Sequence, residues 1–337
     1  MTMSNGTAAR GAIPHHREDA TVSVRDLVYR YGEFVAVEGV SFSIRRGEVF
    51  ALLGTNGAGK TTTLEVLEGF RKPTSGSVEV LGHSPFQERF EVQARTGIML
   101  QESGLIDEMT VVQMLELWQR LSPRDDDPSR LLDLVHLVER RDVPVSSLSG
   151  GEKRRLDFAM SVWGSPEFVV LDEPTTGLDP QSRDQLWQVV QRIRDDGATI
   201  LLTTHYLEEA EALADRVAIM NSGRVAVAGT MSEVLATVPA RISAVSTSLP
   251  GHVLGGLDRE VLGELTLTTE GAQVFLSLET RQLQRDLTRL LDWARQHDVH
   301  LDELRASPAS LSEVFMAVPR NDSAFGDTAV RAEGARN

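Results

Sequence analysis

Short apolar runs alternate with helical patterns from Thr21 to about Gly229. Several of these runs are apolar at every position rather than at every second position, as expected of strands that helices cover on both faces. The pattern predicts an α/β domain with a mixed, largely parallel sheet. The candidate strands are 49–53, 77–81, 97–100, 168–171, 199–203 and 217–220.

Between Gln101 and Trp163 the strand pattern gives way to helical spacing, for example at 111–118 and 131–135. We therefore expect a helical subdomain at about 102–163 within the α/β domain. Three consecutive aspartates at 125–127 separate the two helical patterns. They could hold a metal, but an acidic loop followed by a helix that starts at Pro128 is the simpler interpretation.

After Val238 the pattern changes again, because prolines and glycines break the chain into short strand-like pieces. Residues 272–278 alternate as a half-buried strand does, and 280–296 has the leucine spacing of a helix with Thr280 as its N-cap. We expect an α/β domain at 21–238 and a small C-terminal α+β domain at 239–318. The polar ends, 1–20 and 319–337, are expected to be disordered tails.

Composition narrows the range of functions. The chain has 34 Lys and Arg against 49 Asp and Glu, a net charge of -15, which disfavours binding to nucleic acid. It has no cysteine, so disulfides and thiolate metal sites are excluded and a reducing compartment suits it. No segment approaches the roughly 18 apolar residues of a membrane-spanning helix. A transport pathway would have to come from another chain.

A glycine-rich loop between an apolar strand and a helix is the first candidate for chemistry. Glycine lets successive backbone N–H groups face an anion, and the dipole of the following helix favours phosphate. Lys60 can reach the outer phosphates, and Thr61 offers a hydroxyl to Mg²⁺. We assign nucleotide binding to the loop and the residue after it: Gly54, Thr55, Asn56, Gly57, Ala58, Gly59, Lys60, Thr61 and Thr62.

Two carboxylates follow the apolar strand 168–171. Asp172 lies at the carboxyl end of this strand, where open α/β sheets bind ligands, and can hold Mg²⁺ together with Thr61. Glu173 is the candidate for activating water. Alone, such a pair could be solvated or cap a helix, but the glycine-rich loop favours the magnesium and base roles.

The pentapeptide Leu148-Ser149-Gly150-Gly151-Glu152 precedes a third helical pattern, so its N–H groups form a second anion site. In this order, loop, pentapeptide and carboxylates resemble the ATP-binding cassette of ABC transporters. That resemblance, which spans Tyr31 to His205, implies a P-loop NTPase fold that hydrolyses ATP with Mg²⁺. It also makes the pentapeptide the family's signature motif.

The resemblance assigns further roles. Tyr31 would stack on adenine, with Tyr29 as a rival, and Gln101 would help hold Mg²⁺ and sense a membrane partner. Asp179 would lie in the loop that crosses to a second subunit, and His205 would contact the γ-phosphate. Glu173, His205 and Lys60 form the implied catalytic set, and Thr61, Gln101 and Asp172 the implied metal ligands.

The family also implies an assembly, in which the signature motif of one copy closes on the ATP of another in a homodimer. Ser149, Gly150, Gly151 and Glu152 thus bind nucleotide across the interface. Two residues depart from the family pattern. Thr55 replaces a usual proline and is expected to be tolerated, whereas Glu152 replaces a usual glutamine and adds negative charge beside the nucleotide, which disfavours its expected ribose hydrogen bond.

The segment 307–315 resembles the tail of bacterial drug and antibiotic exporter ATPases of the daunorubicin-resistance type. We therefore expect a subunit at the cytoplasmic face of the cell membrane that powers a separate permease, exporting a drug, antibiotic or lipid-like compound. The alternative is a soluble ABC ATPase acting on ribosomes or DNA, which the single cassette and the negative charge disfavour. Whether the C-terminal domain supports dimerisation or regulates the ATPase stays open.

Overall fold

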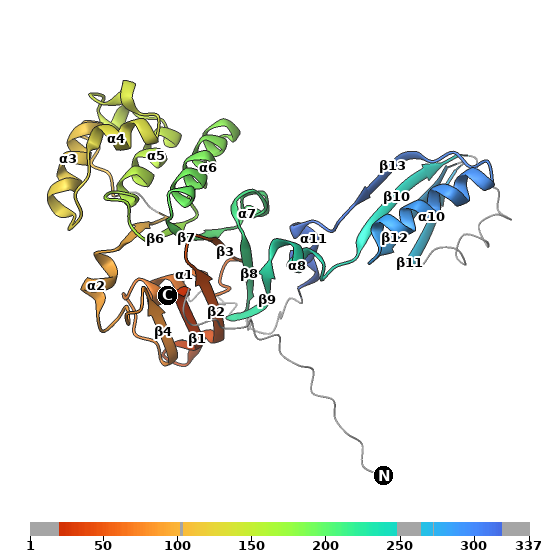
Figure 1. Cartoon of the computed structure of the whole chain (residues 1–337), viewed down its shortest axis with the longest axis horizontal. Coiled ribbons are helices and arrows are strands. Elements are labelled where there is room, and N and C mark those ends of the chain that lie inside the picture. Colours follow the sequence, from red (N-terminus) through yellow and green to blue (C-terminus); the bar gives the residue numbers. More distant parts are fainter. Residues whose placement is uncertain (1–19, 102–103, 248–263, 272, 319–337) are drawn as a thin grey trace, which may run out of the picture.

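The structure is a computed structural model, and it describes residues 20–101, 104–247, 264–271 and 273–318 (Figure 1). The predicted tails lie outside these residues, except that Ala20 already belongs to the first strand. Two separate sheets and an insert of helices make up the chain as far as residue 238, and a further sheet with one long helix follows.

The larger sheet has six strands in the order β5-β6-β7-β3-β8-β9. All its pairs are parallel except that between β8 and β9, which confirms the predicted mixed, largely parallel sheet. Every residue of β3, β6 and β7 is buried, as their uninterrupted apolar runs predict. The strands are β3 (Val49–Gly54), β5 (Thr96–Met99), β6 (Phe168–Asp172), β7 (Thr199–Thr204), β8 (Arg216–Asn221) and β9 (Arg224–Thr230).

The smaller sheet is antiparallel, in the order β2-β1-β4. The candidate strand at 77–81 belongs here as β4, so its place in the parallel sheet was wrongly predicted. Its burial explains the difference, because only two of its six residues are buried and it therefore lacks the two covered faces of a central parallel strand. The strands are β1 (Ala20–Tyr31), β2 (Phe34–Arg45) and β4 (Ser75–Val80).

Helices cover the larger sheet, and three of them gather in the insert at about 102–163, as predicted (Figure 1). Helix α3 begins at a capping box formed by Thr110 and Gln113, and α4 begins at Asp127 with Pro128 in its first turn, as expected for that acidic loop. The helices are α1 (Lys60–Leu67), α2 (Arg89–Gln93), α3 (Val111–Leu121), α4 (Pro128–Leu134), α5 (Gly150–Ser161), α6 (Pro180–Asp195), α7 (Leu207–Leu213) and α8 (Met231–Leu235).

The C-terminal part contains a four-stranded antiparallel sheet, in the order β11-β12-β10-β13, with α10 packed on one face. This confirms the expected small α+β unit. Thr280 is not the N-cap of the helix: it ends β12, and its hydroxyl accepts a hydrogen bond from the Gln282 N–H at 2.8 Å. The elements are β10 (Ala240–Ser246), β11 (Glu264–Glu270), β12 (Gln273–Thr280), α10 (Leu283–Gln296), β13 (Asp302–Ser307) and α11 (Leu311–Ala317).

Helix α11 returns from this unit to the larger sheet. Leu311 and Val314 are buried in one apolar cluster with residues of β3, α7 and β8. The Leu311 N–H donates a hydrogen bond of 2.7 Å to Glu211 Oε1 on α7. The C-terminal unit is therefore attached to the rest of the chain at both of its ends.

Candidate nucleotide site

Three neighbouring parallel strands bring the predicted site residues to one edge of the larger sheet. The glycine-rich loop follows β3, Asp172 ends β6 with Glu173 directly after it, and His205 follows β7. These strands lie in the order β6-β7-β3, so their carboxyl ends meet at the same edge.

The glycine-rich loop is built by close backbone contacts that leave no room for larger residues at two positions. A Cβ atom on Gly54 would lie 2.7 Å from the Met220 carbonyl oxygen, and one on Gly59 would lie 2.6 Å from that of Ala36. Gly59 also has a φ of 100°, which side chains strongly disfavour. Asn56 and Gly57 are exposed at the tip of the loop, where a phosphate can approach.

Lys60 is the first residue of α1 and is buried. Its Nζ donates to the carbonyl oxygens of Gly54 at 2.8 Å and Thr55 at 3.3 Å, so the side chain folds back over the loop. Burial lowers the pKa of Lys60, and the nearby charges of Glu173 and Asp172 oppose this shift. The ammonium group thus lies between the loop and the two carboxylates, where it could form an ion pair with a bound phosphate.

Asp172 and Glu173 have different surroundings although they are adjacent. The buried carboxylate of Asp172 accepts a hydrogen bond from the Thr203 hydroxyl. Burial raises the pKa of Asp172, and Lys60 is among the groups that oppose the shift. Because a cation favours the ionised form, Mg²⁺ binding would stabilise the charge that burial disfavours.

The carboxylate of Glu173 faces His205. Glu173 Oε2 lies 3.2 Å from His205 Nδ1 and accepts a hydrogen bond of 3.1 Å from the Thr176 hydroxyl. The backbone of Glu173 has a φ of 49°, a conformation uncommon for residues other than glycine, and its N–H is held at 3.0 Å by the Thr203 carbonyl. Such strain is typical of functional positions whose surroundings fix them.

The other predicted site residues near the loop differ in accessibility. Thr61 is exposed at the start of α1, whereas Thr62 is buried and its hydroxyl lies 3.3 Å from the Tyr31 hydroxyl. The ring of Tyr31 is 41% exposed, with the Arg71 guanidinium 4.8 Å from its centroid. Tyr29 instead packs against the apolar core, so Tyr31 is the better placed of the two for stacking.

The signature motif forms the start of α5. Ser149 is the N-cap: its hydroxyl accepts the Glu152 N–H at 3.2 Å, and its own N–H donates to Glu152 Oε2 at 2.8 Å. The other oxygen of Glu152 lies 2.8 Å from Arg140 Nε. Partial burial favours the neutral form, but the Ser149 and Arg140 contacts outweigh it and hold the pKa of Glu152 below its usual range.

The two glycines of the motif have different spaces around them. A Cβ atom on Gly150 would meet nothing within 4 Å, whereas one on Gly151 would lie 2.7 Å from the Ser182 hydroxyl on α6. Asp179 caps that same helix, because its carboxylate accepts from the Ser182 N–H at 3.0 Å and from its hydroxyl at 2.7 Å. Gly150 is therefore the open position, at which another molecule can approach the backbone.

Comparisons with known proteins agree with this geometry. A family model described as ABC transporter matches residues 37–176, and one described as ABC transporter domain-containing protein-like, C-terminal domain, matches 245–310. Nod factor export ATP-binding protein I of Ralstonia nicotianae is 36% identical, over 88% of this chain and 92% of its own. Daunorubicin resistance ATP-binding protein DrrA3 of Streptomyces coeruleorubidus is 34% identical, over 90% and 97%. The chain belongs to the ABC transporter family.

Solved structures of the ABC family show the same fold in the first two thirds of the chain. The structure of cbiO1 from Clostridium perfringens, part of an ABC transporter complex, has a TM-score of 0.60 and 28% identity, over 65% of this chain and 92% of its own. The protein is thus an ABC ATPase with an ATP-binding cassette. The relatives named here are export and resistance proteins, which supports the transporter prediction over one of action on ribosomes or DNA.

Metal binding in this ABC ATPase would depend on the nucleotide. Among the described residues, no cluster of three or more His, Asp or Glu could hold a metal ion. Asp172 and Thr61 offer oxygen ligands beside the phosphate loop, and Mg²⁺ is commonly bound by one or two such groups together with substrate phosphates. The donor set fits Mg²⁺ in that mode. Gln101 is exposed just after β5.

Sequence reasoning missed two arginines of the ABC cassette. Arg140 neutralises Glu152 from a short helix at 138–140, and Arg154 lies buried on α5 against the loops after β5 and β6. For Arg154, the basic run Lys153, Arg154 and Arg155 after the signature motif was visible in the sequence, but the direction in which its side chain turns was not. Among the described residues, no helix is long and apolar enough to cross a membrane.

Proposed function

We propose that two copies of this ABC ATPase close head to tail around ATP and Mg²⁺ and power a separate membrane permease at the cytoplasmic face of the membrane. The exported cargo would be a drug, antibiotic or lipid-like compound. The observation that carries the proposal is that two separate helices of one chain, α1 and α5, start at glycine-rich segments that suit an anion. Figure 1 shows α5 among the insert helices, apart from α1.

Each residue of the first site has a task in hydrolysis. Lys60 would bind the outer phosphates, and Tyr31 would stack on the base. Glu173 would accept a proton from the attacking water, while His205, now paired with Glu173, would contact the γ-phosphate. Asp172, Thr61 and Gln101 would hold Mg²⁺, which neutralises charge on the phosphates when bound.

The second site would complete the first one across the dimer. The open position at Gly150 gives a phosphate access to the N–H groups at the start of α5, where the helix dipole favours negative charge. Asp179, which caps α6 beside this helix, would lie at the same interface. A single copy would bind ATP and hydrolyse it poorly.

Exposed apolar side chains support a permease contact. Such residues lie in the turn after α1, before and within α2, and in the stretch that follows β5: Phe70, Phe86, Phe90, Leu100 and Ile106. Phe90 is 75% exposed. Large apolar side chains on a surface mark interaction sites when they are grouped, and Leu100 is adjacent to Gln101, which would sense the permease. The insert helices would share this contact.

Purification of the full chain from its native membranes tests the proposal. We expect two copies of the chain to co-purify with a multi-span permease, and the complex to hydrolyse Mg-ATP faster when the cargo is added. Phe90→Asp should lose the permease at unchanged Tm, whereas Met316→Asp, at the similarly exposed Met316 of α11, should keep it. Co-purification with ribosomes or DNA in place of a permease would overturn the proposal.

A further inference from the structure

Among the described residues, the guanidinium group of Arg154 on α5 donates hydrogen bonds to backbone carbonyl oxygens only. Its Nε donates to Pro174 at 2.9 Å, and its Nη2 donates to Asp172 at 3.0 Å and Glu173 at 2.8 Å. Its Nη1 donates to Leu100 at 2.9 Å and Gln101 at 3.2 Å. A guanidinium group has five N–H donors, so these five carbonyls use its full capacity.

These carbonyls belong to two different loops of the nucleotide site. Leu100 and Gln101 follow β5, whereas Asp172, Glu173 and Pro174 end β6 and start the next loop. The planar guanidinium group of Arg154 therefore fixes the backbone at Gln101, which would bind Mg²⁺, and at Glu173, which would activate water. At Glu173, whose φ is 49°, Arg154 bonds the carbonyl group and Thr203 bonds the N–H group.

The third element that Arg154 connects is its own helix. Arg154 lies two residues after the signature motif, and α5 is anchored by the buried side chains of Leu156 and Phe158. Arg154 itself is 6% exposed, and the Asp157 carboxylate is 3.9 Å away. Burial lowers the pKa of Arg154, and the charges of Asp157, Asp172, Glu173 and Glu209 oppose this shift. Arginine nevertheless stays charged in proteins.

We propose that Arg154 is a positioning residue that couples the signature helix to the backbone of Gln101 and Glu173 in the same subunit. It would act through the two loops rather than on the nucleotide or the metal. When α5 shifts towards the nucleotide of a second copy, the guanidinium group of Arg154 moves both loops with the helix. This inference rests on the proposed function, because Gln101 and Glu173 have their roles from it.

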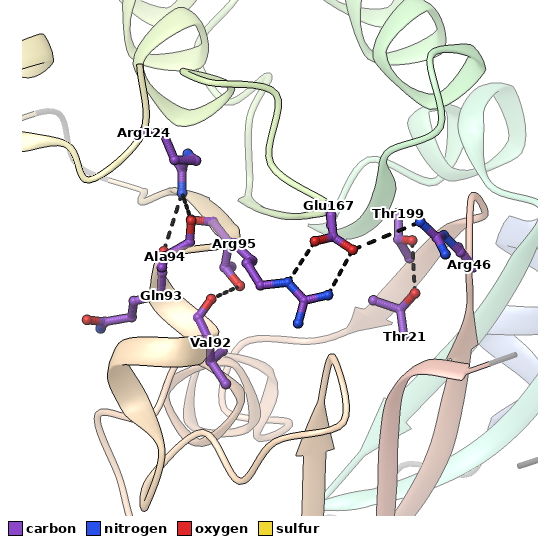
Figure 2. A network of polar contacts seen from close by, with 10 residues as sticks. Thr21, Arg46, Val92, Gln93, Ala94, Arg95, Arg124, Glu167 and Thr199 are labelled. Carbon is purple, nitrogen blue, oxygen red and sulfur yellow. Dashed lines mark hydrogen bonds and ion pairs between the residues drawn. The ribbon is translucent and has the colours of Figure 1, made fainter. Parts of the chain in front are cut away.

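The chain offers a matched control. Within the described parts of the chain, the guanidinium group of Arg124 also donates to backbone carbonyls only: its Nε donates to Trp163 at 2.7 Å, and its Nη1 donates to Gln93, Ala94 and Thr96. Figure 2 shows it pointing towards Gln93 and Ala94, and these carbonyls lie before or at the start of β5, whereas those of Arg154 lie beyond its end. Arg124 thus makes the same kind of contact away from the nucleotide loops.

Lysine substitutions separate positioning from general stability. Lysine keeps the charge, but its compact ammonium group cannot span five carbonyls as the planar fork does. A displacement of about 1 Å at reacting groups can cost about 100-fold in rate. We expect Arg154→Lys to lower the kcat for Mg-ATP at least about tenfold and to leave KM within about twofold, because the phosphate loop is untouched. Arg124→Lys should keep kcat within about twofold at a comparable loss in Tm.

Hydrogen exchange of the full chain without nucleotide gives a second readout. The amides of Leu100, Gln101, Glu173, Thr175 and Thr176 should exchange faster in Arg154→Lys than in the unmodified chain, and at unchanged rates in Arg124→Lys. Equal kcat losses in the two variants, or unchanged exchange in these loops, would overturn the proposal. If the purified chain brings down no permease, the transport role fails, while the exchange comparison still decides the role of Arg154.

Discussion

Arg140→Ala tests how this chain tolerates a carboxylate in its signature motif. Arg140 Nε lies 2.8 Å from Glu152 Oε1, and the contacts with Ser149 and Arg140 hold the pKa of Glu152 below its usual range. Glu152 is therefore ionised at neutral pH. Without Arg140, its negative charge would face the triphosphate of the second copy in the proposed dimer.

The magnitude follows from Coulomb's law. At a separation of about 8 Å and an effective dielectric constant of about 20, one unit charge repels another by about 2 kcal/mol. The head-to-tail dimer contains this contact twice, about 4 kcal/mol in all, which corresponds to a dimer Kd about 1000-fold higher. The free subunit should change less, because the Arg140 side chain is 52% exposed and such a pair contributes about 0.2–1 kcal/mol to stability.

Sedimentation at saturating Mg-ATP, in a Glu173→Gln background that slows hydrolysis, measures the dimer Kd. Arg141→Ala removes the same charge from the exposed neighbouring residue and should have a smaller effect. The added substitution Glu152→Gln should restore the dimer of Arg140→Ala, and about 1 M salt should weaken the effect by shortening the Debye length to about 3 Å. An unchanged dimer Kd, or a loss that persists with Glu152→Gln, would refute the reasoning.

Three further substitutions test the site and its stability. Lys60→Ala should weaken ATP binding to the single subunit at least about tenfold, because a charge facing the phosphates is lost; an unchanged affinity in a fluorescence titration would rule out the loop assignment. Glu173→Gln should keep ATP binding and slow hydrolysis at least about 100-fold; a monomer in light scattering at saturating Mg-ATP would count against the head-to-tail dimer. Burial, with Asp172 and Glu65, raises the pKa of Glu68 to about 7 from 4.5. The folded state thus favours neutral Glu68. Its contribution to the free energy of unfolding is complete below pH 4.5 and is lost as the pH rises through about 7, a change of at most about 3 kcal/mol. Without nucleotide, Glu68→Gln should raise Tm more at about pH 8 than at about pH 5, and equal changes would contradict this.

The central strands and the nucleotide edge could be predicted because their signals are local. A strand buried on both faces is apolar throughout, as β3, β6 and β7 are, and catalytic residues of such sheets follow the strand ends. The β1–β2 pair gives a weaker signal. Its register shifts at several positions, so the alternation of buried and exposed side chains is interrupted near Asp26.

Arg154 could not be predicted for a different reason. Its hydrogen-bond partners are backbone carbonyls, which every residue type supplies, so no partner residue marks the contact in the sequence. The same holds for Arg124. For Arg140 the partner is a side chain, but Glu152 is equally well explained by its capping box with Ser149. The contact between Arg140 and the second carboxylate oxygen of Glu152 depends on the tertiary fold, which the local sequence does not reveal.

One helix joins the two arginine contacts, and this determines how their defects would differ. Glu152 lies in the first turn of α5 and Arg154 two residues later. Phe158 and Ala159 anchor the same helix in the core. A shift of α5 would therefore move both contacts together. Loss of Arg140 would weaken closure, and higher protein and ATP concentrations would restore the dimer by mass action. Loss of the Arg154 fork would leave Gln101 and Glu173 misplaced within a full dimer, so its defect would persist at saturation.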